Sequence, residues 1–218
     1  MRDIHCHILP GVDDGARDLT MSLAMLRAAW NAGVTSIVCT PHCRDPYFDY
    51  DRMRASFDLL QGHADGFPLT MGFEVAYPKL IELGIERWAR RLSFEGSNEF
   101  LLELDPRCTE RDFIDYERAI AHLQGMGLTV IIAHPERYRA IQQDTGIAVR
   151  LVEMGCLLQA SSDFMAGGRF GREKKPVRRL IKQGLYRYVA SDAHIPEHYE
   201  YLRKAMRKFT VHGSHARL

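Results

Sequence analysis

Segments that would place this chain in a membrane are missing from the sequence. No apolar run approaches the roughly 20 residues that a membrane-spanning helix needs. The start, Met1-Arg2-Asp3-Ile4-His5, has no apolar stretch behind its basic residue, so the pattern of a secretory signal is absent. We therefore expect a cytoplasmic protein with no direct membrane insertion.

The sequence also has few cysteines and almost no net charge. The five cysteines form no C-x-x-C pair, and we expect them to be reduced thiols. None has arginine six positions later, as a cysteine phosphatase requires; those positions hold Val12, Asp45, Asp49, Ile114 and Ser162. Lysine and arginine (29) nearly balance aspartate and glutamate (28), giving a net charge of +1. This balance argues against nucleic-acid binding.

Linkers and low-complexity tracts are absent too, and the 218 residues predict a single domain, 1–218. Four times an amphipathic segment ends in glycine and runs into an apolar, β-rich stretch, at Gly33, Gly127, Gly155 and Gly184. Each junction is typical of a helix, a tight turn and a strand.

Three further stretches, around Asp3–His5, Leu69–Val75 and Phe100–Leu104, bring the expected number of strands to seven. Because most of them precede a helix, we predict an α/β fold with parallel strands and right-handed crossovers. Seven strands without a topological switch favour a TIM-like (βα)7 barrel, closed or nearly closed, over an open sheet.

The spacing of apolar residues predicts two of the helices in detail. Leu19, Leu23, Leu26 and Trp30 share one face of the first. Phe113, Tyr116, Ile120 and Leu123 share one face of another, behind a capping box formed by Thr109 and Asp112. We expect both faces to pack on the core.

Side chains that can bind metal stand at or just beyond the ends of the predicted strands. They are His5, His7, Asp13, Asp14, His42, Glu74, Glu103, His134, Asp192 and His194. Each motif alone is weak, since an H-x-H pair is most often structural and an Asp-Asp pair also suits a turn. In a βα barrel, however, these strand ends form one face, where catalysis is found. Charges gathered there are costly unless paired or coordinated, so the convergence predicts a metal site.

The types of donor atom limit which metal ions can bind. Nitrogen and oxygen donors without thiolates suit manganese, iron or zinc in a hydrolytic site. The candidates are too many for one ion and predict two or three divalent ions, with Glu74 and Asp192 as bridging candidates. Such a centre would bind a phosphate and activate a metal-bound hydroxide for phosphoester hydrolysis.

The segment Asp3-Ile4-His5-Cys6-His7-Ile8-Leu9-Pro10-Gly11-Val12-Asp13-Asp14-Gly15-Ala16 closely resembles the opening of the polymerase-and-histidinol-phosphatase (PHP) superfamily. It is most similar to the bacterial manganese-dependent protein tyrosine phosphatases of capsule and exopolysaccharide synthesis. The resemblance continues, nearly to the end of the chain, through the motifs Thr40-Pro41-His42, Gly72-Phe73-Glu74, His134-Pro135-Glu136-Arg137-Tyr138, Gly168-Arg169-Phe170-Gly171 and Ser191-Asp192-Ala193-His194.

The resemblance implies a PHP-type barrel with a trinuclear metal centre, most often manganese, and a phosphotyrosine substrate on the tail of a bacterial tyrosine autokinase. The implied metal ligands are His5, His7, Asp14, His42, Glu74, Glu103, His134, Asp192 and His194. This choice takes Asp14 over Asp13. We expect Arg137, Asp192 and His194 to act in catalysis, and Arg137 with Arg169 to contact the substrate.

The chain departs from the family pattern at Ile195–Tyr199, where a second phosphate-binding arginine is usual. Arg137 is therefore expected to hold the phosphate; its structural alternative is a surface ion pair with Glu136 or a nearby carboxylate. The basic run from Arg169 to Lys182 could attract an acidic phosphopeptide, or form an ordinary solvated helix face. Tyr47, Tyr77 and Tyr138 could line a phosphotyrosine pocket or serve in packing.

Three other functions fit parts of the pattern. A small-molecule phosphatase of the histidinol-phosphate type would use the same metal cluster. An amidohydrolase also opens with H-x-H but needs a bridging lysine where this chain has Glu103. A degenerate barrel used as a binding scaffold would have lost ligands, and none is missing.

Overall fold

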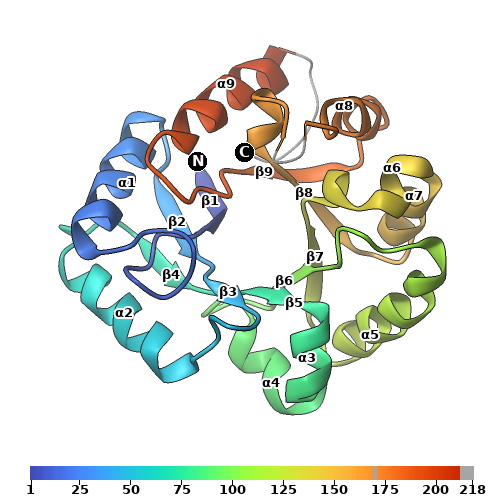
Figure 1. Cartoon of the computed structure of the whole chain (residues 1–218), viewed down its shortest axis with the longest axis horizontal. Helices are drawn as coiled ribbons and strands as arrows, with labels where there is room; N and C mark the ends of the chain where they lie inside the picture. The colour runs from blue at the N-terminus through green and yellow to red at the C-terminus, as the bar shows by residue number, and fades with distance from the viewer. Residues whose placement is uncertain (169–170, 212–218) are drawn as a thin grey trace.

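Strands and helices alternate along the chain (Figure 1). The computed structural model describes residues 1–168 and 171–211. The strands are β1 (Arg2–Cys6), β2 (Ser36–Cys39), β3 (His42–Cys43), β4 (Leu69–Met71), β5 (Glu74–Ala76), β6 (Glu99–Glu103), β7 (Thr129–Ala133), β8 (Leu157–Ser161) and β9 (Tyr186–Ala190). The α-helices are α1 (Leu19–Asn31), α2 (Tyr50–Gly62), α3 (Tyr77–Leu83), α4 (Ile85–Leu92), α5 (Phe113–Gly125), α6 (Arg139–Gln143), α7 (Gly146–Glu153), α8 (Lys174–Lys182) and α9 (His198–Val211). Short 3₁₀ turns lie at Glu110–Asp112, Pro135–Arg137 and Ser162–Met165.

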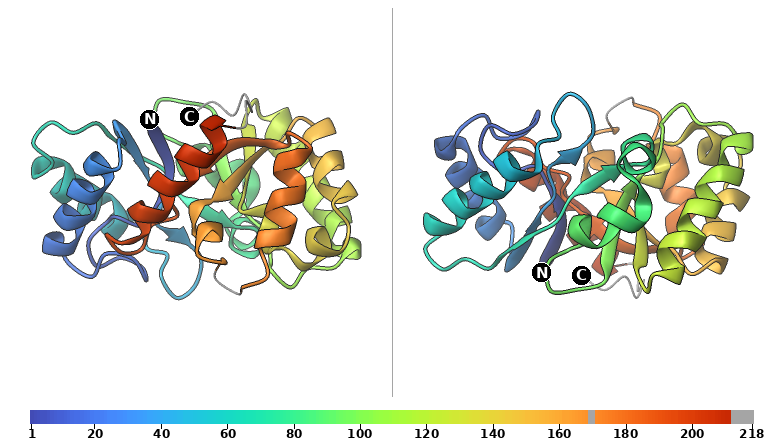
Figure 2. Two further views of the ribbon diagram at one scale, coloured as in Figure 1. Left: turned by 90° about the horizontal axis from the view of Figure 1, so that it is seen from above. Right: turned by 90° about the horizontal axis from the view of Figure 1, so that it is seen from below.

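All strand pairs are parallel, which confirms the predicted α/β class. The pairs form two sheets, in the orders β1-β2-β4 and β3-β5-β6-β7-β8-β9. Helices surround the strands in every view (Figures 1 and 2). The hydrogen-bonded ladders thus differ from the single seven-stranded ring that we predicted, because two of the predicted strands are interrupted.

The interruptions have local causes. Pro41, which has no backbone N–H, separates β2 from β3, and β3 itself was not predicted. The expected strand Leu69–Val75 divides into β4 and β5 at Gly72, where an added Cβ would lie 2.8 Å from a methyl group of Val38. Hydrogen bonds from Gly72 N to Cys39 O (2.9 Å) and from Glu74 N to Pro41 O (3.2 Å) continue the pairing across the gap.

The predicted junctions of helix, glycine and strand are confirmed. Gly33, Gly127, Gly155 and Gly184 follow α1, α5, α7 and α8 and all have positive φ, between 68° and 90°. This left-handed conformation costs glycine little and reverses the chain into the next strand.

The two predicted helix faces fare differently. In α5, Phe113, Tyr116, Ile120 and Leu123 are all buried, and the capping box of Thr109 and Asp112 is present. In α1 the prediction was wrong in part.

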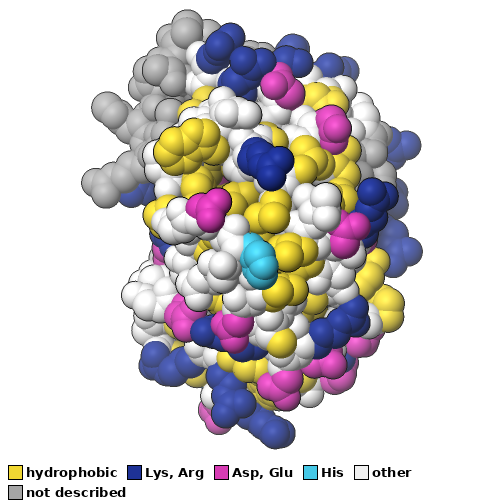
Figure 3. Space-filling view, turned by 90° about the vertical axis from the view of Figure 1, so that its left-hand side faces the viewer, with side chains coloured by type: hydrophobic (Ala, Val, Ile, Leu, Met, Phe, Trp, Pro, Cys, Tyr) yellow, Lys and Arg dark blue, Asp and Glu magenta, His cyan; other side chains and the backbone are white. Residues whose placement is uncertain are grey.

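The buried residues of α1 are Ser22, Met25, Leu26 and Ala29, whereas the Trp30 residue is 66% exposed. The indole of Trp30 instead contacts Phe67, with the two ring centres 6.1 Å apart. The face bearing α1 and α2 shows hydrophobic side chains among the charges (Figure 3).

Within the two described ranges, no helix has both the length and the apolar character required to span a bilayer. All five cysteines lie in this part of the chain, and each is buried with a free thiol.

Candidate metal centre

The residues that were predicted as metal ligands meet in one cluster. Four overlapping groups have potential ligand atoms within 4.8 Å of one another. Their members are His7, Asp14, His42 and His194; His5, His134 and Asp192; His5, His7 and Glu74; and His42, Glu74 and Glu103. The structure therefore brings together all nine residues that were predicted as ligands, and eight of them are buried or nearly so.

Glu74 lies at the centre of this cluster. Its Oε1 is 2.7 Å from His134 Nε2 and 3.4 Å from His5 Nε2. Its Oε2 is 2.7 Å from His42 Nδ1 and 3.4 Å from His7 Nε2. One buried carboxylate thus faces four imidazoles, as a bridging ligand would.

Asp192 lies between the histidines and a buried arginine. Its Oδ1 is 3.4 Å from His5 Nε2 and 3.3 Å from His7 Nε2. Its Oδ2 accepts a hydrogen bond from Arg137 Nη2 at 2.5 Å. The same Nη2 also donates to Asp163 (2.8 Å) and to Ser161 Oγ (3.2 Å). Arg137 is therefore a buried part of the cluster, and its expected alternative as a surface ion pair was wrong.

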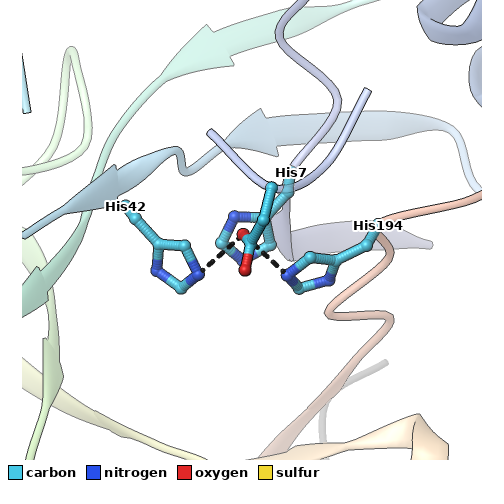
Figure 4. Close-up of side chains that lie close together, drawn as sticks. His7, His42 and His194 are labelled. Atoms are coloured by element: carbon cyan, nitrogen blue, oxygen red, sulfur yellow. Dashed lines mark ion pairs between the residues drawn. The ribbon is translucent and has the colours of Figure 1, made fainter. Parts of the chain in front are cut away.

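Asp14 closes the cluster on the side nearer to solvent. Its Oδ1 is 3.2 Å from His42 Nε2 and 3.4 Å from His194 Nε2. The rings of His42 and His194 point toward this carboxylate from opposite sides, and His7 lies behind it (Figure 4). The side chain of His194 is 14% exposed, more than that of any other histidine in the cluster.

Two polar residues orient the histidines from outside. Asp13 Oδ2 lies 2.8 Å from His7 Nδ1, and Gln159 Oε1 lies 2.9 Å from His5 Nδ1. Each pair directs the Nε2 atom of the imidazole into the cluster, as the outer partners of metal-binding histidines do. Asp13 lies outside the four groups of candidate ligands, whereas Asp14 belongs to one of them. Gln159 was not predicted, although one polar residue inside the apolar strand β8 is a signal that could have found it.

The backbone is unusual at two cluster residues. His134 (φ 30°), directly after β7, and Asp192 (φ 49°), two residues after the end of β9, lie in the left-handed region, which non-glycine residues seldom adopt. Such a conformation costs on the order of 1–3 kcal/mol and is found preferentially at functional sites. Here it turns each side chain toward the centre at the point where its strand ends.

Burial and mutual charge set the protonation of the cluster. Burial lowers the pKa of His5, but Glu74 and Asp192 outweigh it and raise that pKa to about 8. For His134, burial and Arg137 together lower the pKa to about 4. Burial, with the charge of Glu74, raises the pKa of Glu103 to about 7. The surroundings thus favour the protonated form of His5 and of Glu103 and the neutral form of His134.

Several buried donor and acceptor atoms of the cluster have no hydrogen-bond partner among the described residues. They are His42 Nδ1, Glu74 Oε2, His134 Nδ1 and His194 Nε2. His42 Nδ1 and Glu74 Oε2 are 2.7 Å apart but are not aligned as a hydrogen bond. A native structure rarely leaves such atoms unsatisfied, so the donor set fits divalent cations.

The family comparison agrees with this geometry. The model of the family described as "Capsular polysaccharide synthesis, CpsB/CapC" matches residues 1–212. The chain belongs to the CpsB/CapC family. This assignment confirms the resemblance found in the sequence motifs.

Relatives in the CpsB/CapC family are named as phosphatases. The tyrosine-protein phosphatase YwqE of Bacillus subtilis is 35% identical over 205 residues, which cover 89% of this chain and 77% of YwqE. The tyrosine-protein phosphatase CpsB of Streptococcus pneumoniae is 29% identical over 205 residues, covering 89% and 83% of the two chains.

A solved structure supports the same family at the level of the fold. It comes from the crystal structures of YwqE and CpsB, metal-dependent tyrosine phosphatases, and it superposes with a TM-score of 0.81 at 32% identity. The match covers 95% of this chain and 87% of the other.

The thiols of this CpsB/CapC chain are poor nucleophiles. Burial raises the pKa of Cys6 well above its usual value, and burial raises the pKa of Cys43 and of Cys156 to about 12. Cys6, which lies between two histidines in sequence, pairs its sulfur with Tyr199 Oη at 3.0 Å. These cysteines are packing residues, as the missing arginine motif predicted.

The remaining sequence predictions have different outcomes. Arg169 lies outside the described residues. Tyr138 is fully buried and donates to Ala133 O (2.6 Å), so it is a packing residue. Tyr47 stacks on His42 with ring centres 5.9 Å apart. Arg44, which sequence reasoning missed, reaches the cluster from the loop after β3.

Proposed function

We propose that this chain is a metal-dependent protein tyrosine phosphatase that acts on the phosphotyrosine tail of a bacterial tyrosine kinase in capsule or exopolysaccharide synthesis. The observation that carries this proposal is the buried cluster around Glu74, whose unsatisfied atoms fit cations. Membership in the CpsB/CapC family and the names of its members supply the substrate class.

The four overlapping groups can hold two or three divalent ions, with manganese first and iron or zinc as alternatives. Glu74 belongs to two of these groups and is the first candidate for a bridging ligand. Ions bound there would clamp phosphoryl oxygens and lower the pKa of a bound water, which supplies a nucleophile near neutral pH.

The protein's own groups position the reaction. Arg137 fixes the carboxylate of Asp192 and neutralises part of the negative charge beside an incoming phosphate. The imidazole of His194 is held by a contact from its Nδ1 to Asp192 O at 2.9 Å and lies at the solvent side, where substrate arrives. We assign the catalytic roles to Arg137, Asp192 and His194. Arg137 is also proposed to favour the phosphoryl group by its charge, and Arg169 remains proposed as a substrate contact.

Closure of the strands into one distorted PHP-type barrel, (βα)7, belongs to this proposal, because the cluster draws ligands from around the whole ring. Two contacts support closure between β1 and the end of β9. They are a parallel bridge between Cys6 and Ala193 and a hydrogen bond from Asp192 N to His5 O at 2.8 Å. We also propose a cytoplasmic location, where the kinase tail would lie.

The test compares substrates on one preparation of known metal content. A phosphotyrosine peptide and histidinol phosphate would be assayed side by side, before chelation, after chelation and after adding back Mn²⁺. We expect metal-dependent turnover of the peptide. Faster turnover of histidinol phosphate would assign the small-molecule reaction instead. Undiminished turnover after exhaustive chelation would reject metal catalysis altogether.

A further inference from the structure

Arg44 lies at the rim of the cluster. Its Nη2 is 2.8 Å from His42 Nε2 and 3.6 Å from Asp14 Oδ2, and its Nη1 is 3.6 Å from Glu103 Oε2. The guanidinium also lies over the ring of Tyr47, 5.9 Å from its centre. The side chain is thus held beside three cluster residues without being enclosed by them.

The two arginines of the cluster differ in how their donors are used. Arg137 is 6% exposed at its side chain, and one nitrogen already serves two carboxylates and a hydroxyl. Arg44 is 30% exposed, and its two carboxylate contacts, at 3.6 Å, are longer than hydrogen bonds. A guanidinium has five N–H donors, so Arg44 keeps a fork that can bind an arriving anion.

A groove leads from Arg44 to the surface. This cavity has a volume of about 340 Å³, with Arg44 and Glu103 on its wall at the cluster end. Ala76, Pro78, Leu104 and Pro106 contribute apolar surface along it. Lys79, also on the wall, is already paired with Asp45 (2.9 Å) and Glu82 (2.8 Å). Arg44 therefore lies where the groove meets the cluster, beside Glu103, and carries a positive charge there.

We propose that Arg44 binds the phosphoryl group of the substrate, and that the groove from Arg44 to Pro106 receives the phenyl ring of phosphotyrosine. The inference rests on the proposed function and deepens it. A planar guanidinium matches two phosphoryl oxygens at once, which a point charge does not. The apolar wall beside it suits an aryl group better than the single methylene of phosphoserine, which is too short to contact it.

The test uses full-length, metal-loaded protein with variants Arg44→Ala, Arg44→Lys and Ala76→Leu. Arg118→Ala is the matched control, because Arg118 is an exposed arginine paired with Asp115 on α5. The readouts are metal content, KM and kcat for a phosphotyrosine peptide, and the affinity for inorganic phosphate measured by calorimetry. Arg44→Ala should weaken the affinity for phosphate and raise KM for the peptide, each about tenfold to a hundredfold. Arg44→Lys should recover part of both.

Ala76→Leu fills the groove, so it should raise KM for the peptide and leave phosphate affinity unchanged. Unchanged phosphate affinity in Arg44→Ala would overturn the proposal. The proposal would also be overturned if Arg44→Ala lost metal and excess Mn²⁺ restored its phosphate affinity. In that case Arg44 would act only by positioning His42 as a metal ligand. Failure of the wild type to hydrolyse the peptide would reject the proposed function, whereas phosphate binding still tests Arg44.

Discussion

The two ends of the strands treat charged side chains in opposite ways. At the amino ends, Arg2 pairs with Glu99 at 2.7 Å, and Tyr188 donates to the other oxygen of Glu99 at 2.8 Å. The Arg2 side chain is 39% exposed, so water shares its charge. At the carboxyl ends, Glu74 is enclosed and faces four imidazoles, while several nearby atoms have no hydrogen-bond partner within the described part of the chain.

This difference separates stability from function. A charged group that is satisfied by its partners and by solvent can stabilise the fold. A buried set of carboxylates and imidazoles, in contrast, costs stability unless a cation binds to it. In βα barrels, chemistry is found at the carboxyl ends of the strands and stability at the other face. Substitutions at the two ends should therefore change different measurements.

The largest effect is expected for the central carboxylates. Glu74→Gln and Asp192→Asn keep the shape of each side chain but remove a charge that several imidazoles share. Turnover of a phosphotyrosine peptide should fall on the order of a thousandfold, as when a central charge-stabilising group is lost. Metal content, measured by elemental analysis, should fall with it. A variant that keeps both its metals and its turnover would contradict the central role of that carboxylate.

The second comparison uses one glycine at each end. A Cβ added at Gly15 would lie 2.1 Å from His7 O, so Gly15→Ala must displace the backbone of a cluster histidine. We expect turnover to fall about tenfold to a hundredfold, the usual cost of an ångström-scale misplacement.

Gly33 is the control for this prediction. A Cβ there would meet no atom of a described residue within 4 Å, but φ is +90°, which disfavours alanine. Gly33→Ala should lower the free energy of unfolding by about 1–2 kcal/mol and leave turnover unchanged. Denaturant unfolding and turnover, measured on both variants, separate the two effects. Equal losses of turnover would remove the contrast.

The outcome for individual residues shows what sequence patterns can predict. His134 and Asp192 were found because each follows an apolar strand, and the carboxyl ends of parallel strands must meet. The same reasoning could not predict that Arg137 is buried, since its exposure depends on Asp163, which lies close to it only in the folded chain.

The errors have similar causes. Trp30 fits the periodicity of α1, but the buried face of this helix includes Ser22, Met25 and Ala29 instead. Arg44 lies in a loop without periodicity, so nothing in its spacing points to the cluster. Local patterns thus predict the elements and the strand ends. The direction of loop side chains depends on contacts between distant segments.

A smaller effect than for the central carboxylates is expected at Arg137. Its guanidinium holds Asp192 and Asp163, so Arg137→Ala should reduce turnover about tenfold to a thousandfold, the equivalent of about 1.5–4 kcal/mol. Arg137→Lys can replace the charge but not the three contacts of Nη2, and should recover only part of the activity. Kinetics and metal content would be measured together. Wild-type turnover in Arg137→Ala with its metals in place would show that Asp192 needs no such support.

The smallest effect on stability and turnover is expected at the amino ends of the strands. Glu99→Gln removes the charge that pairs with Arg2 but leaves an oxygen that can accept from Tyr188. Because Arg2 is well exposed and the contact is screened by salt, the loss in the free energy of unfolding should stay below about 1 kcal/mol. Turnover and metal content should equal those of the wild type. Urea denaturation at low and high salt is the sharper measurement, since the difference between wild type and variant should shrink as salt rises. A loss of metal on this substitution would mean that the amino ends also organise the cluster, and the division of labour between the two ends would fail.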